Sequence, residues 1–478
     1  MRKCGAFLLV LFAPAAGLWL AAQAPTHVVI MHTNDIHGQL LPRAGIGGMA
    51  EIAAIIRRAK PDLILDAGDF STGTFLADEF RGVPTIASMN QIRYTSGTIG
   101  NHEFDYGQPA LRMLIRQARF PILSANIAAP VPGIKKYAII SSQGIRFGII
   151  GLTTERVKTL SHPNDVVGVK VFDIVKSVET LLPEVRKRSD VIIATVHLED
   201  EEEQRLASAF PEIRLIIGGH NHEALGPIRL GQTLVAKTGV AGRNVGRVDL
   251  EFQNKKLVQM DARLIPVKDV QAELDVVKIL QPFQEKVNAK MGEIIGEATD
   301  DLMYSRTGES ALGDLVADAF REKGKTQIAL QNIGGIRARI IKGSVTWGNA
   351  FEVLPFQNTL ITLKLTGAQL KKTLEHGLVS SIGMVAISGI RVQFDTKNPA
   401  GKQVASLLLT DGTPVDDSKL YSITTNDFVL AGGDGFTEFA KGTDIRDTGI
   451  LLRDVLVDYI KARRLLSAVL DERIIVKW

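Results

Sequence analysis

Apolar and polar residues alternate along the first half of the chain in a pattern typical of a layered α/β domain. From residue 25 to about residue 267, short runs rich in β-branched residues predict strands, and the amphipathic stretches between them predict helices. The predicted strands cover residues 27–31, 62–65, 95–99, 122–124, 146–150, 191–196 and 214–217. The predicted helices cover residues 46–58, 84–93, 108–118, 172–187 and 201–210.

A second pattern begins near residue 292, after a charged and helix-prone stretch at residues 268–291. Helical and strand-like runs are mixed there and are separated by glycine-rich turns. The helical runs cover residues 311–323, 367–376 and 451–462, and the strand-like runs cover residues 327–330, 360–365, 390–394 and 420–425. Because 478 residues exceed what one hydrophobic core usually organises, two domains joined by a helix are expected.

Residues 1–24 read as a secretory signal peptide. Arg2 and Lys3 precede an apolar run that ends in small residues before Pro25, which is the order of features in a cleaved signal. The sequence therefore predicts a periplasmic or secreted protein that has no stable membrane association after cleavage. A membrane anchor stays open as the alternative, because an apolar run of this length can just span a bilayer.

Composition and charge narrow the class of protein further. The one cysteine, Cys4, leaves with the signal, so the mature chain is expected to carry no thiol, which suits an oxidising compartment. Cleavage also removes two basic residues and no acidic one, so the formal charge falls from +4 to +2. A nearly neutral chain gives no electrostatic case for a nucleic-acid partner.

Side chains that can bind metal gather directly after the predicted strands. They are Asp35 and His37 after the first strand, Asp69 after the second, Asn101 and His102 after the third, His197 after the sixth, and His220 and His222 after the seventh. Because α/β sheets bind ligands beyond the carboxyl ends of their strands, these turns are expected to converge. Five of the nine histidines of the chain fall in these turns.

Leaving His102 aside, these turns offer two aspartates, four histidines and one asparagine. That set is too large for one zinc ion, and it suits two borderline first-row cations with water in the open positions. Two such ions about 3.5–4 Å apart can clamp the attacking and departing oxygens of an in-line phosphoryl displacement. The predicted reaction is therefore hydrolysis of a phosphate ester or anhydride.

His102 is expected to face the substrate, because it directly follows the predicted ligand Asn101. Asp105 can accept a hydrogen bond from one of its ring nitrogens and hold the imidazolium charged. A charged His102 stabilises the transferring phosphoryl group and can protonate the leaving oxygen. Glu103 is interpreted as a structural residue of the turn.

Motifs in both halves of the chain resemble the 5'-nucleotidase family. The first half resembles its calcineurin-like metallophosphoesterase domain in HTNDIHG (32–38), DAGD (66–69), GNHEFDYG (100–107), VHLE (196–199) and GGHNH (218–222). The second half resembles its C-terminal domain in NIGGIR (332–337), VLPF (353–356) and FVLAGGDGF (428–436). The branch most similar is that of periplasmic UDP-sugar hydrolase/5'-nucleotidase enzymes. The resemblance implies a four-layer α/β/β/α sandwich at residues 25–267, a linker helix at 268–291 and an α+β substrate-binding domain at 292–478.

The resemblance also implies a role for each site residue. One divalent ion (Mn, Zn, Co or similar) is held by Asp35, His37, Asp69 and His222. The other is held by Asp69, Asn101, His197 and His220, and His102 with Asp105 forms the catalytic dyad. The implied substrate-binding residues are Arg306 and Arg337 for phosphate, Asn332 for a polar contact, Phe356 and Phe428 for the base, and Asp434 for the ribose.

The residues themselves support the substrate-binding roles less strongly than the resemblance does. Core packing explains either phenylalanine equally well, and Asp434 between glycines is equally typical of a turn. One departure from the family concerns phosphate binding. The UDP-sugar hydrolase members often carry a further arginine near Arg306, where this chain has Thr-Gly-Glu-Ser at 307–310.

The implied function is release of phosphate from nucleoside 5'-monophosphates, and activity on UDP-sugars or other nucleotide diphosphates stays open. A 2',3'-cyclic-nucleotide phosphodiesterase/3'-nucleotidase is the main alternative, and Asn34 and Asp105 argue against it by comparison with that branch. A thiosulfate-oxidation hydrolase shares the two domains but needs no residues for a base. A non-catalytic nucleotide-binding protein is a further alternative, against which the intact His102–Asp105 pair argues.

Overall fold

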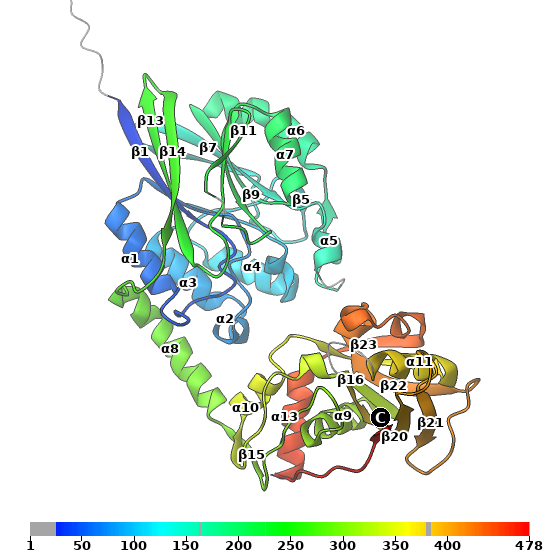
Figure 1. Ribbon diagram of the computed structural model, residues 1–478. Helices are drawn as coiled ribbons and strands as arrows, with labels where there is room; N and C mark the ends of the chain where they lie inside the picture. The colour runs from blue at the N-terminus through cyan, green and yellow to red at the C-terminus, as the bar shows by residue number, and fades with distance from the viewer. Residues whose placement is uncertain (1–24, 162–163, 225, 379–383, 478) are drawn as a thin grey trace, which may run out of the picture. The chain divides into compact units, whose positions relative to one another are not determined.

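The computed structural model describes residues 25–161, 164–224, 226–378 and 384–477 (Figure 1). The chain divides into two compact units, of which the first ends at Glu285 and the second begins at Lys286. This boundary falls inside helix α8, Leu274–Met291, which the sequence predicted at residues 268–291. The signal peptide predicted at residues 1–24 lies outside the described residues. Within the described ranges, no helix combines the length and the apolar character needed to cross a membrane.

Two six-stranded mixed sheets form the centre of the first unit (Figure 1). The first sheet has the strand order β14 (Lys256–Pro266), β13 (Asn244–Gln253), β1 (Thr26–Thr33), β2 (Leu63–Asp66), β3 (Ser96–Thr98) and β4 (Ile122–Leu123). The second sheet has the order β11 (Ile228–Leu230), β12 (Thr233–Ala236), β10 (Ile213–Gly219), β9 (Val191–His197), β7 (Ile145–Thr153) and β6 (Tyr137–Ser142). Strands β1 to β4 are mutually parallel, as are β7, β9, β10 and β12.

Successive side chains in the strands of the second sheet point alternately into two hydrophobic cores, one on each face of the sheet. In β7, Phe147 and Ile149 belong to the core between the sheets, whereas Ile150 and Leu152 belong to the core beneath the helices. Burying each such side chain contributes roughly 1.5–3 kcal/mol. Because both faces of the sheet are covered, its parallel strands are apolar throughout, which is why the sequence showed them as short continuous runs.

Helices cover the outer faces of this pair of sheets. Helix α1 (Met49–Ala59) contacts β1 and β13, and α3 (Val83–Ile92) packs beside it and beside α4 (Gly107–Gln117). Helices α6 (Ile174–Arg188) and α7 (Asp200–Ala209) share the second core with β7, β9 and β10. The expected four-layer α/β/β/α sandwich is therefore confirmed. Short elements complete the unit: α2 (Phe75–Glu79), α5 (Val157–Leu160), and the pair β5 (Ile127–Ala128) and β8 (Lys170–Val171).

The second unit is an α+β fold around a five-stranded sheet. Its strands have the order β19 (Val385–Ser388), β16 (Ile328–Asn332), β22 (Leu420–Asn426), β18 (Thr359–Thr366) and β23 (Thr443–Leu451). Two three-stranded sheets accompany it, formed by β17 (Gly343–Thr346), β15 (Ile294–Ala298) and β24 (Leu465–Leu466), and by β21 (Val404–Leu409), β20 (Ile390–Asp395) and β25 (Ile474–Lys477). The helices are α9 (Ala311–Gly324), α10 (Trp347–Val353), α11 (Gly367–Gly377), α12 (Asp427–Leu430) and α13 (Leu452–Arg463).

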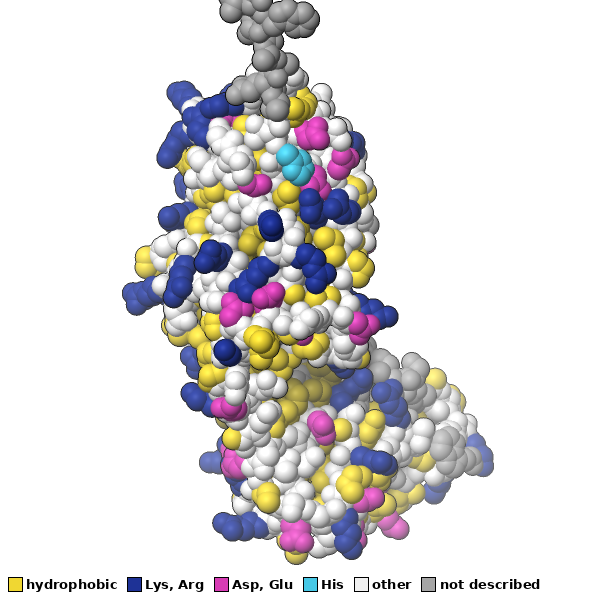
Figure 2. Space-filling model, turned by 90° about the vertical axis from the view of Figure 1, so that its left-hand side faces the viewer, with side chains coloured by type: hydrophobic (Ala, Val, Ile, Leu, Met, Phe, Trp, Pro, Cys, Tyr) yellow, Lys and Arg dark blue, Asp and Glu magenta, His cyan; other side chains and the backbone are white. Residues whose placement is uncertain are grey.

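Charged side chains are dispersed over the face of the molecule shown in Figure 2. Lysine and arginine side chains alternate there with acidic side chains and with small apolar areas, and the described residues form no continuous basic field on that face. This distribution agrees with the small formal charge of the chain.

Candidate active site

The turns after five strands of the first unit converge, as the sequence predicted. Backbone hydrogen bonds hold two of them side by side, because Asp35 N–H donates to Gly68 O and His37 N–H donates to Asp69 O, both at 2.9 Å. The predicted metal ligands follow β1, β2, β3 and β10 or end β9. The carboxyl ends of parallel strands in both sheets thus form one rim of polar side chains.

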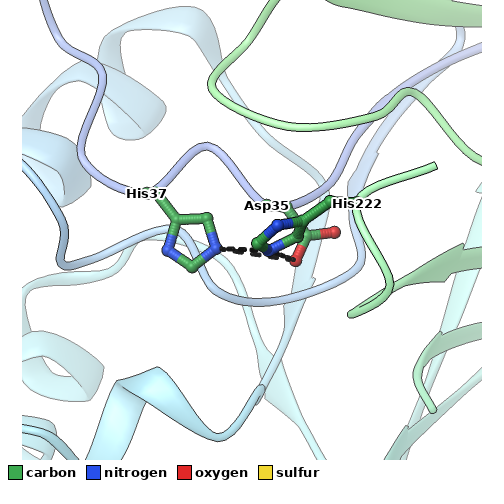
Figure 3. A group of neighbouring side chains, drawn as sticks. All are labelled: Asp35, His37 and His222. Carbon is green, nitrogen blue, oxygen red and sulfur yellow. Dashed lines mark hydrogen bonds and ion pairs between the residues drawn. The ribbon is translucent and has the colours of Figure 1, made fainter. Parts of the chain in front are cut away.

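Asp35, His37 and His222 form the first group of potential ligands (Figure 3). His37 Nε2 lies 3.0 Å from His222 Nε2 and 3.8 Å from Asp35 Oδ1. His222 Nε2 lies 3.6 Å from the same carboxylate oxygen. Two aromatic nitrogens and a carboxylate oxygen therefore point toward one another from two separate turns.

Asp69, His197 and His220 form the second group. His197 is fully buried, and its Nδ1 donates to Ala67 O at 2.9 Å, which turns Nε2 toward Asp69 Oδ2 at 2.9 Å. His220 Nε2 lies 3.2 Å from Glu199 Oε1. A carboxylate on one ring nitrogen fixes the tautomer and leaves the other nitrogen as the ligand atom.

Asp69 lies between the two groups. Its Oδ2 is 2.9 Å from His197 Nε2 and 4.0 Å from His37 Nε2, so the carboxylate contacts histidines of both groups. Asp69, His37 and His102 also form a third group of nearby ligand atoms, all within 4.8 Å of one another. Proximity alone therefore does not separate His102 from the ligands.

The geometry of these groups fits divalent cations. Ligand atoms about 2.0–2.2 Å from a shared cation lie roughly 3–4 Å from each other. The three distances within the first group, 3.0, 3.8 and 3.6 Å, fall in this range, and the ligand atoms of the second group lie within 4.8 Å of one another. Two buried polar atoms of the predicted ligands, His197 Nε2 and Asn101 Oδ1, also lack a hydrogen-bond partner among the described residues. His197 Nε2 approaches Asp69 closely without hydrogen-bonding geometry, which is expected of two atoms that bind one ion.

Five of the seven predicted ligands adopt left-handed backbone conformations. Positive φ is uncommon outside glycine and costs of order 1–3 kcal/mol at a strained position. Such conformations persist where the surroundings impose them, and they cluster at functional sites. The five residues are Asp35 (φ 48°), His37 (φ 46°), Asp69 (φ 54°), His220 (φ 91°) and His222 (φ 62°).

Electrostatics at the second group also favour a bound cation. Burial lowers the pKa of His197, but the charge of Asp69 and the contact with it outweigh burial and raise the pKa to about 10. The protein without an ion thus holds a proton on a fully buried imidazole because the surrounding field is negative. A divalent cation satisfies the same field and displaces that proton on binding.

His102 and Asp105 form the expected pair. His102 Nδ1 lies 2.7 Å from Asp105 Oδ2, which also accepts from Thr72 Oγ1 at 3.2 Å. Burial lowers the pKa of His102, but the hydrogen bond to Asp105 and the charge of Asp69 raise it overall to about 9. The contact with Asp105 therefore favours the protonated imidazole, and it uses Nδ1 and not Nε2.

Glu103 has a larger role than the sequence suggested. Its buried carboxylate accepts hydrogen bonds from the backbone N–H groups of Asp69 (2.9 Å), Phe70 (3.0 Å), Ser71 (3.2 Å) and Gly100 (2.8 Å). It therefore fixes both the turn after β2 and the turn after β3. Its motif, GNHE, showed a carboxylate beside the ligands and includes its partner Gly100, but the other three partners lie 32 to 34 residues away in the sequence.

Glycine is required where these two turns meet. A Cβ at Gly68, which has φ 97°, would lie 2.9 Å from Gly100 N and from His197 Nδ1. A Cβ at Gly100 would lie 2.1 Å from Asp69 Oδ1. The expected close approach of the backbone at Gly68 is thus observed, and Gly100 shares it.

In the second unit, Arg337 and Phe356 lie together. The guanidinium carbon of Arg337 is 5.9 Å from the centre of the Phe356 ring. Phe356 is 48% exposed and Phe428 is 44% exposed, so core packing does not explain either ring. Large apolar side chains this exposed are candidates for stacking on a planar ligand.

The 431–436 loop brings together three predicted substrate residues, Asn332, Asp434 and Phe428. Asn332 Nδ2 donates to Asp434 Oδ2 at 2.7 Å, and Asn332 is itself fixed by Asn426 at 3.0 Å. Asp434 has φ 54°, so it also shapes the turn, and Gly433 leaves room for the Phe428 ring. Arg306 is exposed in the loop before α9, and the backbone N–H of Met384 donates to its carbonyl at 3.0 Å.

Each half of the chain matches a known protein family. Residues 28–224 match the calcineurin-like phosphoesterase family, and residues 294–441 match the 5'-nucleotidase C-terminal domain. These matches include every predicted metal ligand and every predicted substrate residue.

Similar proteins extend the likeness over nearly the whole chain. The crystal structure of a 5'-nucleotidase precursor from Thermus thermophilus is 31% identical, with 94% of this chain and 99% of that chain covered and a TM-score of 0.63. A 5'-nucleotidase of Vibrio cholerae is 28% identical over 91% of this chain and 90% of its own length. A trifunctional nucleotide phosphoesterase of Bacillus subtilis is 29% identical over 94% of this chain. The chain spans only about a third (34%) of the length of that last relative.

Proposed function

Since this chain belongs to the 5'-nucleotidase family of metal-dependent hydrolases, we propose that it releases phosphate from nucleoside 5'-monophosphates with two divalent cations. The observation that carries the proposal is the pair of ligand groups with Asp69 between them, 2.9 Å from His197 of one group and 4.0 Å from His37 of the other. A carboxylate between two nitrogen-rich groups is the arrangement that a dinuclear phosphohydrolase requires. Mn²⁺, Zn²⁺ and Co²⁺ are the cations that this mixed oxygen and nitrogen set favours.

In this proposal the ligands divide according to the two groups. Asp35, His37, Asp69 and His222 hold one cation, and Asp69, Asn101, His197 and His220 hold the other. When bound, the cations supply Lewis-acid stabilisation of the phosphoryl charge and a nucleophile at neutral pH.

His102 acts on the substrate itself. Its Nε2–H donates to a phosphoryl oxygen and transfers the proton to the leaving oxygen, while Asp105 keeps Nδ1 protonated and the ring oriented. The 2.7 Å contact with Asp105 supports this division of roles. The same contact uses Nδ1, so His102 has one nitrogen for the substrate.

The second unit supplies recognition of the nucleotide. Arg306 and Arg337 bind phosphate, and a guanidinium can do so with two parallel hydrogen bonds. Phe356 and Phe428 stack on the base, and Asn332 with Asp434 contacts the ribose side. Stacking tolerates any base because each base has a π-face, so the proposal covers purine and pyrimidine nucleotides alike.

Cleavage of UDP-sugars or other nucleotide diphosphates is a finer possibility within the same mechanism. The Bacillus subtilis relative named a trifunctional nucleotide phosphoesterase supports testing more than one substrate class. A 2',3'-cyclic-nucleotide phosphodiesterase/3'-nucleotidase is the alternative that the same test addresses.

We also propose that the protein acts outside the cytoplasm, after cleavage of residues 1–24. The support is the order of basic, apolar and small residues in that segment. Amino-terminal sequencing of protein recovered from the medium or periplasm is expected to begin at or near Pro25. An intact amino terminus on membrane-bound protein would show that the segment stays as an anchor.

The central test follows the hydrolysis of AMP, UDP-glucose and 2',3'-cyclic AMP by separating the nucleoside and nucleotide products, because only the monoester AMP yields inorganic phosphate in a single step. Treatment with EDTA is expected to abolish AMP hydrolysis, and Mn²⁺, Co²⁺ or Zn²⁺ is expected to restore it. The variant Asp69→Asn should lose both cations and the activity, whereas Asp190→Asn, which removes an acid of the same unit paired to Arg146, should retain them. AMP hydrolysis that survives EDTA would refute the proposal, and a preference for the cyclic substrate would select the alternative.

A further inference from the structure

Lys237 and Thr238 directly follow strand β12, beside the turn that carries His220 and His222. Strands β10 and β12 are parallel neighbours, so the chain leaves both of them at the same edge of the sheet. Neither Lys237 nor Thr238 has a role in the proposed reaction. Each nevertheless begins a chain of hydrogen bonds that ends among the metal ligands.

The first chain starts at the ammonium group of Lys237. This side chain is only 1% exposed, and Nζ lies 2.7 Å from Asp200 Oδ1 and 2.8 Å from Glu203 Oε2. Asp200 Oδ1 also accepts a hydrogen bond from Asn221 Nδ2 at 2.5 Å. Asn221 is the residue between the two histidines of the turn, so the buried ammonium is connected to that turn through one carboxylate oxygen.

The second chain starts at Thr238. Its backbone N–H and its Oγ1 donate to Asn34 Oδ1 at 2.8 Å and 2.7 Å. Asn34 Nδ2 donates in turn to Asp35 Oδ2 at 2.7 Å and to Gly239 O at 2.8 Å. Thr238, Asn34 and Asp35 are all at most 2% exposed, so this chain has no access to bulk water.

A purely structural role explains these contacts less well. A buried ammonium costs several kcal/mol in desolvation, and a well-packed apolar side chain is often as stabilising. The turn that Asn221 occupies is strained, because His220 has φ 91° and His222 has φ 62°. Strained conformations persist only where their surroundings fix them, and the hydrogen bond from Asn221 to Asp200 supplies such a constraint.

We propose that Lys237 and Thr238 are positioning residues for metal binding. Lys237, acting through Asp200 and Asn221, holds the turn that presents one histidine to each cation. Thr238, acting through Asn34, orients Asp35 toward the first cation. The inference rests on the proposed function and adds to it residues that contact neither cation nor substrate.

The test titrates EDTA-treated protein with Mn²⁺ by calorimetry and measures the unfolding of the metal-free protein separately. Loss of a side chain that orients a metal ligand typically weakens metal affinity about 10- to 100-fold. Lys237→Met and Asp200→Ala are expected to weaken Mn²⁺ at both sites by such a factor. Thr238→Val is expected to weaken one of the two binding steps, because Asp35 belongs to one group. The double variant Lys237→Met/Asp200→Ala should lose no more than either single variant.

Arg146→Met is the matched control. It removes the 2.9 Å ion pair between Arg146 and Asp190 at the amino-terminal end of β7, opposite the edge that carries the ligands. Its Mn²⁺ affinities should equal those of the wild type.

Asp200→Ala keeps the test decisive if Lys237→Met does not fold. The Asp200 side chain is 63% exposed, and after its loss Glu203 still pairs with the buried Lys237 ammonium at 2.8 Å, so the metal-free protein should stay folded. Wild-type Mn²⁺ affinity in Asp200→Ala would overturn the role of Lys237, and wild-type affinities in Thr238→Val would overturn that of Thr238. Wild-type protein that binds no Mn²⁺ would instead refute the proposed function, and this inference with it.

Discussion

The buried carboxylate of Glu103 accepts a hydrogen bond from the backbone N–H of Asp69 at 2.9 Å. The same Oε2 accepts the N–H of Gly100 at 2.8 Å, so one side chain fixes the turns after β2 and β3. Asp69 lies between the two ligand groups, and its position therefore depends on Glu103. A residue that contacts neither cation nor substrate thus sets the geometry of the residue on which both groups converge.

Glu103→Gln is expected to lower the free energy of unfolding of the first unit by roughly 2–4 kcal/mol. The substitution turns one carboxylate oxygen into an NH₂ group that faces backbone N–H donors, and each buried donor left unsatisfied costs about 1–3 kcal/mol. Guanidinium unfolding in EDTA measures this effect without bound metal. Glu179→Gln, on the exposed face of α6, should change stability by no more than about 0.5 kcal/mol. Equal stabilities of the two variants would contradict the anchoring role.

His102→Ala is expected to reduce kcat by about 10²- to 10⁴-fold, on the scale of a lost general acid, while the content of bound Mn²⁺ stays at the wild-type value. Metal analysis of the purified variant beside its kcat for AMP makes the distinction. His27→Ala, which removes a half-exposed histidine paired with Asp249 at 3.2 Å, should change neither quantity. A loss of Mn²⁺ in His102→Ala would identify His102 as a ligand, as its proximity to His37 and Asp69 allows.

The elements that carry the site were predictable because they are buried and strongly patterned. Strand β9, predicted at residues 191–196, spans Val191–His197, and α9, predicted at residues 311–323, spans Ala311–Gly324. The hairpin of β13 and β14 and the edge strand β6 were not predicted. Their burial alternates or is only partial, so they lack the continuous apolar runs by which the other strands were recognised.

The chemical types of the ligands were also predictable, but their arrangement was not. Strand-end positions indicated which side chains would meet, whereas the contact of Asp69 with His197 joins two sheets and depends on how they pack. Aspartate and histidine adopt left-handed conformations more often than most residues, but too rarely for the sequence to assign such a conformation to a given ligand. The buried contacts of Glu103, Lys237 and Thr238 were also not predicted, because most of their partners are distant along the chain.

Phe356→Ala and Phe428→Ala are expected to raise KM for AMP, because stacking on a base is worth about 1–3 kcal/mol, or roughly 5- to 150-fold in affinity. Neither substitution should raise KM for p-nitrophenyl phosphate by as much as it raises KM for AMP, since p-nitrophenyl phosphate lacks a nucleobase. Phe172→Ala is the matched control, because Phe172 is also 48% exposed but belongs to the first unit. Equal losses on both substrates would show that the two rings serve the fold and not the base.

Asp314 of α9 is expected to make the second unit less stable as the pH rises. Its side chain is 3% exposed, Oδ2 has no hydrogen-bond partner among the described residues, and Arg473 Nε lies 3.8 Å away. Burial raises the pKa of Asp314 to about 8, against the opposing charge of Arg473. The unfolded chain releases this proton near pH 4 and the folded chain near pH 8, so the contribution to stability is complete below about pH 4 and is lost between these values.

Asp314→Asn removes this titration, so its stability relative to the wild type should increase from about pH 4 to pH 8 and level off above that range. Fluorescence of tryptophan measures the transition of the second unit in a protein that begins at residue 25, because residues 25–478 carry tryptophan only at positions 347 and 478. Taking the difference between the two proteins at each pH cancels the titration of every other group that the substitution leaves unchanged. A difference that is constant across this range would mean that Asp314 stays ionised in the folded protein, with Arg473 outweighing the effect of burial.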